Sequence, residues 1–131
     1  MTYLLDTNIC IFIMKKTPRV VAQFKDVQSS GVAISAITLA ELELGVSKSQ
    51  AIERNRNALL AFSTLVNILP FDVVAAAEYG NIRATLEKKG QSIGILDTLI
   101  AAHAKSLNLT LVTNNTREFQ RVDRLTIEDW M

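Results

Sequence analysis

Four acidic residues stand at places where a parallel β-sheet presents functional groups. Asp6 follows the apolar run at positions 3–5, and three further acids, Glu41, Asp97 and Glu118, lie near the starts of later helix-like segments. Ligands of open α/β sheets bind beyond the carboxyl ends of the strands, where the strand order reverses. Carboxylates gathered at that place could bind a hard divalent cation and act on phosphate groups.

Each of these acids also has a simpler interpretation as a helix cap. Asp is a favoured N-cap residue, so Asp6 and Asp97 could serve only the first amides of a helix. Thr38 precedes Glu41, and Asn115 precedes Glu118, at the spacing of a capping box, in which the acid serves its own helix terminus. Taken singly, capping is the favoured explanation of Glu41 and Glu118.

Strand-like and helix-like segments alternate along the chain, which predicts a mostly parallel sheet covered by helices. The expected strands cover residues 3–5, 32–35, 66–71, 109–113 and 125–127. The expected helices cover residues 8–15, 18–28, 38–46, 50–65, 73–89 and 97–107, with a turn at 29–31 and a short helical turn at 116–119. We therefore expect one α/β domain over residues 1–131, with a five-stranded sheet flanked by helices.

The four acids could meet in one crevice if the strands are ordered 3-2-1-4-5. This order would place the ends of the first and fourth strands side by side, so Asp6 and Glu118 would be neighbours. Glu41 and Asp97 could project into the same crevice from helices. Asp72, another acid at a helix start, would follow the edge strand and lie too far away. This strand order therefore separates four candidate site residues from a fifth acid.

A cluster of carboxylates needs a cation or protons to be stable. Two carboxylates about 5 Å apart repel by roughly 3 kcal/mol at an effective dielectric constant of about 20. Carboxylate ligands without Cys or a nearby His argue against zinc and favour Mg²⁺ or Mn²⁺. His103 follows Asp97 by six residues in the same expected helix, so the two side chains do not share a face. His103 is therefore left out of the predicted site.

The composition is that of a globular domain of ordinary size. The chain has 131 residues, of which 49% are hydrophobic, so it can bury a core without disulfides or a structural metal. Cys10, the single cysteine, lies among apolar residues and is expected to be a small buried hydrophobe. No apolar run is long enough to span a bilayer and the N-terminus lacks the features of a signal peptide, so we expect a cytoplasmic protein without membrane contact.

The formal net charge of +1 gives no long-range attraction for nucleic acid. Any nucleic-acid binding must therefore be local. Lys15, Lys16, Arg117 and Arg121 lie near the predicted site and could hold an RNA backbone, although they could equally be ordinary surface charges.

Four segments carry a resemblance to a known family. They are YLLDTN at 3–8, ITLAEL at 37–42, IGILDTLIAAHA at 93–104 and LVTNNTREF at 111–119. In their order and spacing these segments resemble the PIN-domain ribonucleases, specifically the bacterial VapC toxins, and the match spans essentially the whole chain. One departure concerns Asn115, because many PIN domains have an acid there. Asn115 cannot supply the negative charge of that acid, so the charge at this end of the site depends on Glu118.

The resemblance implies a Mg²⁺- or Mn²⁺-dependent endoribonuclease that cuts structured RNA such as tRNA or rRNA and so stops translation. It implies that Asp6 and Asp97 bind the metal and that Glu41 and Glu118 complete a catalytic cluster. Thr7, Asn8 and Asn115 are candidates for supporting these ligands. The metal would position a water for in-line attack on a phosphodiester. The resemblance also implies a homodimer and a VapB-type antitoxin whose C-terminal segment covers the active-site groove and an exposed apolar face.

Two other functions remain open at this point. A phosphatase of the haloacid-dehalogenase kind would use Asp6 as nucleophile and needs a second acid two residues later, where this chain has Asn8. A binding module without enzymatic activity would use its acids only as caps. In that case loss of Asp6 or Asp97 would change stability and leave activity in cells unaltered.

Overall fold

A five-stranded parallel sheet forms the centre of the molecule. The computed structural model describes all 131 residues. The strands are β1 (Tyr3–Leu5), β2 (Val32–Ser35), β3 (Asn67–Leu69), β4 (Thr110–Val112) and β5 (Ile127–Glu128). They are ordered β3-β2-β1-β4-β5 and every neighbouring pair is parallel. The fold class and the strand order predicted from the sequence are therefore confirmed.

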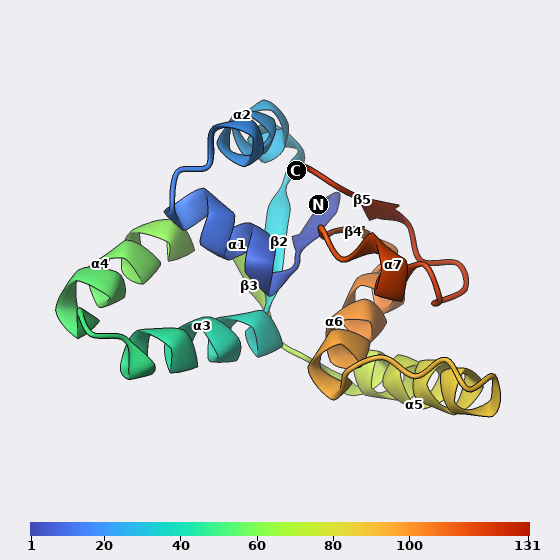
Figure 1. Cartoon of the computed structure of the whole chain (residues 1–131). Helices are drawn as coiled ribbons and strands as arrows, with labels where there is room; N and C mark the ends of the chain where they lie inside the picture. Colours follow the sequence, from blue (N-terminus) through green and yellow to red (C-terminus); the bar gives the residue numbers. More distant parts are fainter.

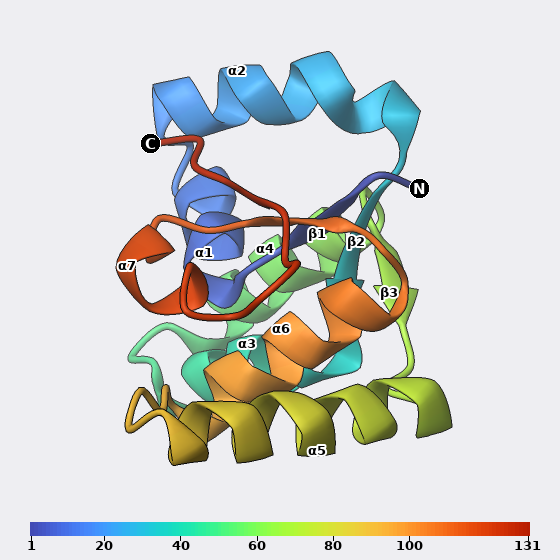
Figure 2. The ribbon, with the colours of Figure 1, turned by 90° about the vertical axis from the view of Figure 1, so that its right-hand side faces the viewer.

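Seven α-helices surround the sheet (Figure 1). They are α1 (Thr7–Met14), α2 (Pro18–Val27), α3 (Ala36–Lys48), α4 (Ile52–Ser63), α5 (Val73–Lys88), α6 (Ile95–Ser106) and α7 (Thr116–Phe119), with a 3₁₀ turn η1 (Gln28–Ser30) before β2. In Figure 2, α2 lies above the sheet and α5 lies below it, with α6 between α5 and the strands. None of the helices is both long and apolar enough to cross a membrane.

Two buried clusters hold the layers together, one on each face of the sheet. Successive side chains of a strand point to opposite faces, so Leu5 joins the cluster formed with α1, α2 and α4, whereas Leu4 joins the cluster formed with α5 and α6. Cys10 is fully buried in the first cluster, as the sequence predicted, and its burial raises the pKa of the thiol well above its ordinary value. The edge formed by the carboxyl ends of the strands therefore lies between the helices that cover the two faces.

Some element boundaries differ from those expected. Helix α3 begins at Ala36 rather than at residue 38, because the Ser35 side chain caps it by accepting from the Ile37 amide. Helix α6 begins at Ile95 rather than at Asp97, with Gly94 as its N-cap. Strand β3 is shorter than the expected segment 66–71. Because α3 and α6 begin earlier than expected, Glu41 and Asp97 lie inside their helices and do not cap them.

Candidate active site

Asp6 directly follows the carboxyl end of β1, and the residue is 5% exposed. The Thr7 amide donates to Asp6 Oδ1 at 2.8 Å, so Asp6 does cap α1. The Thr113 hydroxyl donates to the other oxygen, Oδ2, also at 2.8 Å. Burial raises the pKa of Asp6, while these two hydrogen bonds oppose the rise. Capping and a role in a site are thus compatible for this residue.

Thr113 is a site residue that the sequence reasoning did not single out. It directly follows β4, and Leu5 of β1 pairs with Val112 of β4, so one step further along the register Thr113 lies beside Asp6. Thr113 is fully buried, and its hydroxyl also accepts from the Asn115 amide at 2.9 Å. Thr113 is the last residue of the expected fourth strand, and the predicted strand order places that strand beside the first. This position is the signal in the sequence that could have identified it.

Glu41 reaches the same place from α3. The Thr7 hydroxyl donates to Glu41 Oε1 at 2.7 Å, which links the first turn of α1 to α3. The capping-box interpretation of Thr38 and Glu41 is wrong, because Ser35 is the N-cap and Thr38 is a buried residue of the helix interior. Thr7 therefore hydrogen-bonds one acid of the cluster, whereas Asn8 is exposed.

Asp97 lies in the first turn of α6, facing the other acids. Its pKa is raised to about 7, first by burial and then by the charge of Asp6, a hydrogen bond with Glu118, and the charges of Glu118 and Glu41. Negative charges near a carboxyl group disfavour its ionised form and so add to the rise that burial causes. The four acids chosen from the sequence are therefore brought into electrostatic contact, whereas Asp72 caps α5 through the Ala75 amide.

Glu118 is positioned by the residue that departs from the family pattern. The Asn115 side-chain amide donates to Glu118 Oε2 at 3.0 Å. Asn115 is the N-cap of α7 but makes no side-chain capping bond, so the capping-box interpretation of this turn is also wrong. Asn115 supplies no charge, but it orients a carboxylate that does.

The donor set fits a hard divalent cation held by few protein ligands. No group of three or more His, Cys, Asp or Glu side chains is arranged to hold one metal ion. Mg²⁺ is usually bound through one or two carboxylates and keeps several waters. Asp6 and Asp97 supply two carboxylates, and the negative charge of Asp6 contributes to the raised pKa of Asp97. Cys10 packs in the apolar cluster and His103 contacts Ser35, so neither is counted with the four acids.

The basic residues suggested for RNA lie in different surroundings. Lys15 and Lys16 are exposed at the end of α1, and Arg117 is exposed on α7. The guanidinium group of Arg121 donates to the Ser92 carbonyl at 3.2 Å. Arg121 therefore binds the loop that contains Ser92 and that precedes α6, the helix of Asp97.

Replacing Thr113 by valine should lower the free energy of unfolding by about 1–3 kcal/mol, because the buried Asp6 carboxylate and the half-buried backbone amide of Asn115 each lose a partner. The loss should be larger at pH 8 than at pH 4, since the hydroxyl lowers the pKa of Asp6 by supporting its ionised form. Urea denaturation at both pH values measures it. Thr113→Ser keeps the hydroxyl and should resemble the wild type, and equal stability of Thr113→Val would contradict the assigned bonds.

Comparison with known proteins agrees with this geometry. The PIN domain family matches residues 3–125. The chain is 44% identical over 128 residues to the tRNA(fMet)-specific endonuclease VapC of Shigella flexneri, covering 98% of this chain and 97% of that protein. It belongs to the PIN-domain family, among the VapC proteins. The chain is also 43% identical to Ribonuclease VapC2 of Rickettsia felis, covering 99% of this chain and 98% of that one.

Solved structures of VapC relatives have the same fold. The crystal structure of VapBC2 from Rickettsia felis bound to a DNA fragment from their promoter matches all of both chains, with a TM-score of 0.95 and 41% identity. DNA-bound VapBC from Salmonella typhimurium matches with a TM-score of 0.95 and 43% identity, over 100% of this chain and 99% of that chain. The resemblance stated from the four sequence motifs is therefore confirmed.

Proposed function

We propose that this VapC-family protein is an endoribonuclease toxin that hydrolyses phosphodiester bonds of tRNA, stops translation and is neutralised by a cognate antitoxin. The observation that carries the proposal is the convergence of Asp6, Glu41, Asp97 and Glu118 at the carboxyl edge of the sheet, with the pKa of Asp97 raised to about 7. The similarity to tRNA(fMet)-specific endonucleases supports tRNA as the substrate class. The site of action would then be the cytoplasm.

Asp6 and Asp97 would hold Mg²⁺ or Mn²⁺. When bound, the cation offsets negative charge that develops on the phosphate and on the leaving oxygen. Thr113 and the Thr7 amide each hold one oxygen of Asp6, which fixes the carboxylate before any cation arrives. Such preorganisation spares the site a rearrangement during the reaction. It also explains why a buried acid is kept at the end of β1.

Glu41 would orient and deprotonate the attacking water. Its Oε1 is held by the Thr7 hydroxyl, which leaves the second oxygen to accept a proton. Glu118 shares a hydrogen bond with Asp97 and accepts from Asn115, so it fixes the position of Asp97. No side chain needs to attack the phosphate. Exposed Lys15, Lys16 and Arg117 could contact the RNA backbone on either side of this cluster.

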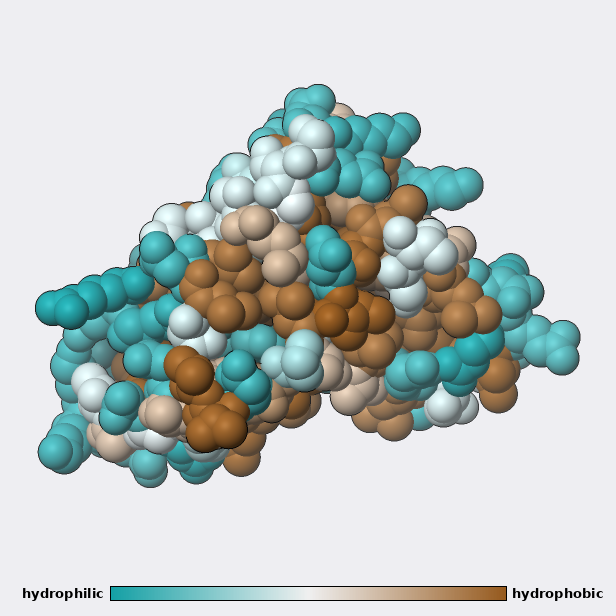
Figure 3. All heavy atoms as spheres, turned by 180° about the vertical axis from the view of Figure 1, so that it is seen from behind, coloured by the Kyte–Doolittle hydropathy of each residue, from teal (hydrophilic) through white to brown (hydrophobic).

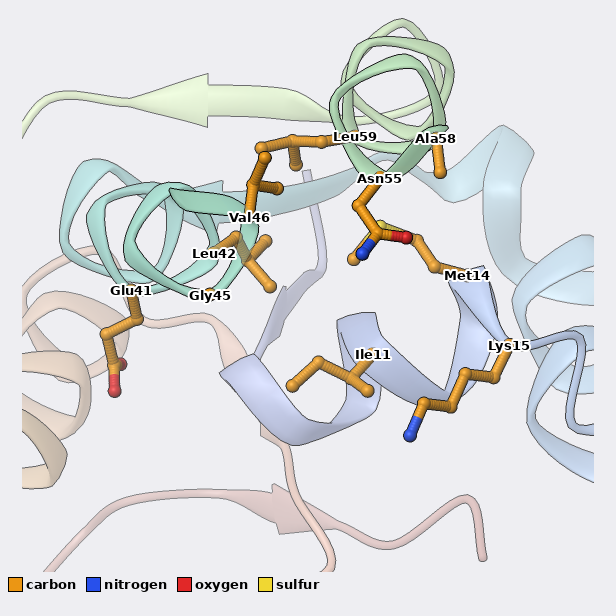
Figure 4. Close-up of a pocket in the computed structure, with 10 residues that line it drawn as sticks. All are labelled: Ile11, Met14, Lys15, Glu41, Leu42, Gly45, Val46, Asn55, Ala58 and Leu59. Atoms are coloured by element: carbon orange, nitrogen blue, oxygen red, sulfur yellow. The ribbon is translucent and has the colours of Figure 1, made fainter. Parts of the chain in front are cut away.

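A groove beside the acids offers a binding place for the antitoxin. It lies between α1, α3 and α4, has a volume of about 310 Å³, and runs from Glu41 past Gly45 towards Lys15 and Asn55 (Figure 4). Most of its lining is apolar, with Leu42 among the side chains. The solved relatives include VapBC complexes, in which a VapC chain is assembled with VapB. An antitoxin segment in this groove would end beside Glu41 and cover the site.

Gly45→Phe should prevent neutralisation by the antitoxin without removing RNA cleavage. A Cβ at Gly45 would meet nothing within 4 Å, so the ring can enter the groove without disturbing α3. We expect the antitoxin concentration needed for half-inhibition of RNA cleavage to rise about 100-fold or more, a change of about 2.7 kcal/mol. Gly45→Ala is the matched control, because its Cβ meets nothing within 4 Å and adds no ring to the groove. Equal inhibition of both variants would place the antitoxin elsewhere.

A second apolar surface is suited to a homodimer. Seen from behind, brown apolar side chains extend over the middle and lower parts of the molecule (Figure 3). The exposed large apolar side chains of the chain include Ile68 on β3 and, at the start of α5, Val73 at 85% and Val74 at 59% exposure. Apolar side chains grouped on a surface mark protein contacts. We propose that two copies associate through this face.

The proposed function is tested by incubating the purified protein with total cellular RNA and sequencing the new 5′ ends. We expect discrete cuts in one tRNA species with Mg²⁺ or Mn²⁺, none with a chelator, and none when antitoxin is added first. New ends spread over all RNA classes would contradict a tRNA-specific toxin. Absence of any new ends under all metal conditions would contradict the nuclease itself.

A further inference from the structure

A buried polar pair joins the two helices that carry Glu41 and Asp97. His103 Nδ1 lies 2.7 Å from the Ser35 hydroxyl, 68 residues away in the sequence. His103 is 1% exposed and Ser35 is fully buried. Ser35 Oγ already accepts from the Ile37 amide, so its own proton is free to be donated to Nδ1. This assignment makes the imidazole neutral with its proton on Nε2.

Ser35 belongs to the same edge of the sheet as the candidate active site. Leu4 pairs with Ala33, so two residues further along both strands Asp6 lies beside Ser35. On the other side Leu5 pairs with Val112, so one residue further Asp6 lies beside Thr113. Ser35 also caps α3, the helix that carries Glu41. A group that contacts Ser35 therefore acts on the starting point of α3 at the edge where the acids meet.

His103 belongs to α6, the helix that carries Asp97. Helices α3 and α6 pack against each other, and Figures 1 and 2 both show the start of α3 beside α6. Glu41 follows Ser35 by six residues, and Asp97 precedes His103 by six residues. Each acid thus lies about 9 Å along its helix from the buried pair. A tilt of about 10° at the pair would shift each acid by about 1.5 Å.

The surroundings of His103 leave the imidazole little freedom. The Phe71 ring packs edge-on against it, with 5.4 Å between the ring centres. Burial lowers the pKa of His103, whereas the charge of Asp72 opposes this effect. The other side chains of α6 that are buried nearby are mostly alanine and isoleucine, and they allow close packing without a directed bond. The Ser35 contact is the directed one between these two helices.

We propose that Ser35 and His103 are positioning residues for the metal-binding carboxylates, because their hydrogen bond fixes α6 against the start of α3 and so sets the separation of Asp97 from Glu41. This role rests on the proposed nuclease function. A misplacement of about 1 Å in a reacting group can lower a rate about 100-fold. The pair should therefore affect kcat and metal affinity more than the binding of RNA.

The test measures Mn²⁺ affinity by titration calorimetry, together with kcat and KM for RNA cleavage, in the full chain. His103→Ala should weaken Mn²⁺ binding about 10-fold and lower kcat about 10- to 100-fold, with KM for RNA changed less than about threefold. His103→Asn should restore most of both quantities, since asparagine also carries a polar atom at the δ position. His103→Gln should not restore Mn²⁺ affinity or kcat, because the polar atoms of glutamine lie one bond further from the backbone. The double variant Ser35→Ala/His103→Ala should lose no more Mn²⁺ affinity and kcat than the more damaging of the two single variants, because both substitutions remove the same hydrogen bond.

Ile82→Val provides a control for stability alone, because Ile82 on α5 is buried in the apolar cluster shared with α6 and carries no polar group that could bond to Ser35 or to the acids. If Ile82→Val and His103→Ala have equal Tm but only His103→Ala loses Mn²⁺ affinity and kcat, the positioning role is supported. Equal Mn²⁺ affinity and kcat in both variants would overturn it. If His103→Ala does not fold, the comparison of His103→Asn with His103→Gln decides in the same way. A wild type that neither binds Mn²⁺ nor cuts RNA would instead overturn the proposed function, and the positioning role with it.

Discussion

Asp6→Asn and Asp97→Asn should each lower the rate of RNA cleavage by about 1000-fold or more while the protein remains folded. Each substitution removes one negative charge from a site where Asp97 has a pKa of about 7 because of its burial and its charged neighbours. A 1000-fold loss corresponds to about 4 kcal/mol of lost transition-state stabilisation. Single-turnover cleavage of a purified tRNA substrate, with Tm measured on the same samples, gives both quantities.

The fold should survive the Asp6→Asn substitution for a specific reason. Asparagine is as good an N-cap as aspartate, so the side-chain carbonyl oxygen that the substitution retains can still accept from the Thr7 amide. The matched control is Asp72→Asn, since Asp72 also caps a helix but stands at the edge strand away from the cluster. We expect that control to cleave at the wild-type rate. If all three variants cleave equally, the acids are caps and the chain is a binding module.

The strand order could be predicted because chemistry and topology point to the same place. An acid directly after a short buried strand is informative only if the strands are parallel and their carboxyl ends meet. Asp6 supplied that information for β1, and Glu118, just beyond the fourth strand, supplied it for β4. The separation of Asp72 from the other acids followed from its strand being at the edge.

The helix starts were harder to predict because several polar residues compete for each cap. Thr38 and Asp97 both have suitable side chains, yet the helices begin two residues earlier than expected, after the caps Ser35 and Gly94. A strand that ends at Ser35 leaves no room for a linker, so the helix starts at once. The consequence is functional, since an acid inside the helix points into the crevice rather than back at its own amides.

Contacts between distant segments were not visible in the sequence. Thr113 acquires its role only because β4 lies beside β1, and its place at the end of a strand does not by itself reveal the hydrogen bond to Asp6. His103 was set aside because it does not share a helix face with Asp97, which says nothing about its contact with Ser35. Asn115 was identified as a departure from the family, but its hydrogen bond to Glu118 is visible only in three dimensions.

Without metal, Asp97→Asn should be more stable than the wild type at pH 8 by about 2 kcal/mol, and equally stable near pH 4. The pKa of Asp97 is raised from 3.8 to about 7, so between these values the folded protein binds the proton that the unfolded chain has lost. Stability of the wild type therefore falls as pH rises through this window. The full shift corresponds to roughly 4 kcal/mol, which we halve because Asp97 is partly exposed to screening solvent.

Urea denaturation in the presence of a chelator, from pH 4 to pH 8, measures this difference. Asp26→Asn, on the exposed side of α2, serves as the control because it should follow the wild type. A metal ion that binds only the folded protein should then reverse the order. Saturating Mn²⁺ at about 100 times its Kd adds about 2.7 kcal/mol to the wild type at pH 8 and little to Asp97→Asn. Parallel pH profiles of the two proteins would contradict the close approach of Asp97 to the other acids. A reversal by Mn²⁺ would instead show that the same repulsion that weakens the free protein prepares it for a cation.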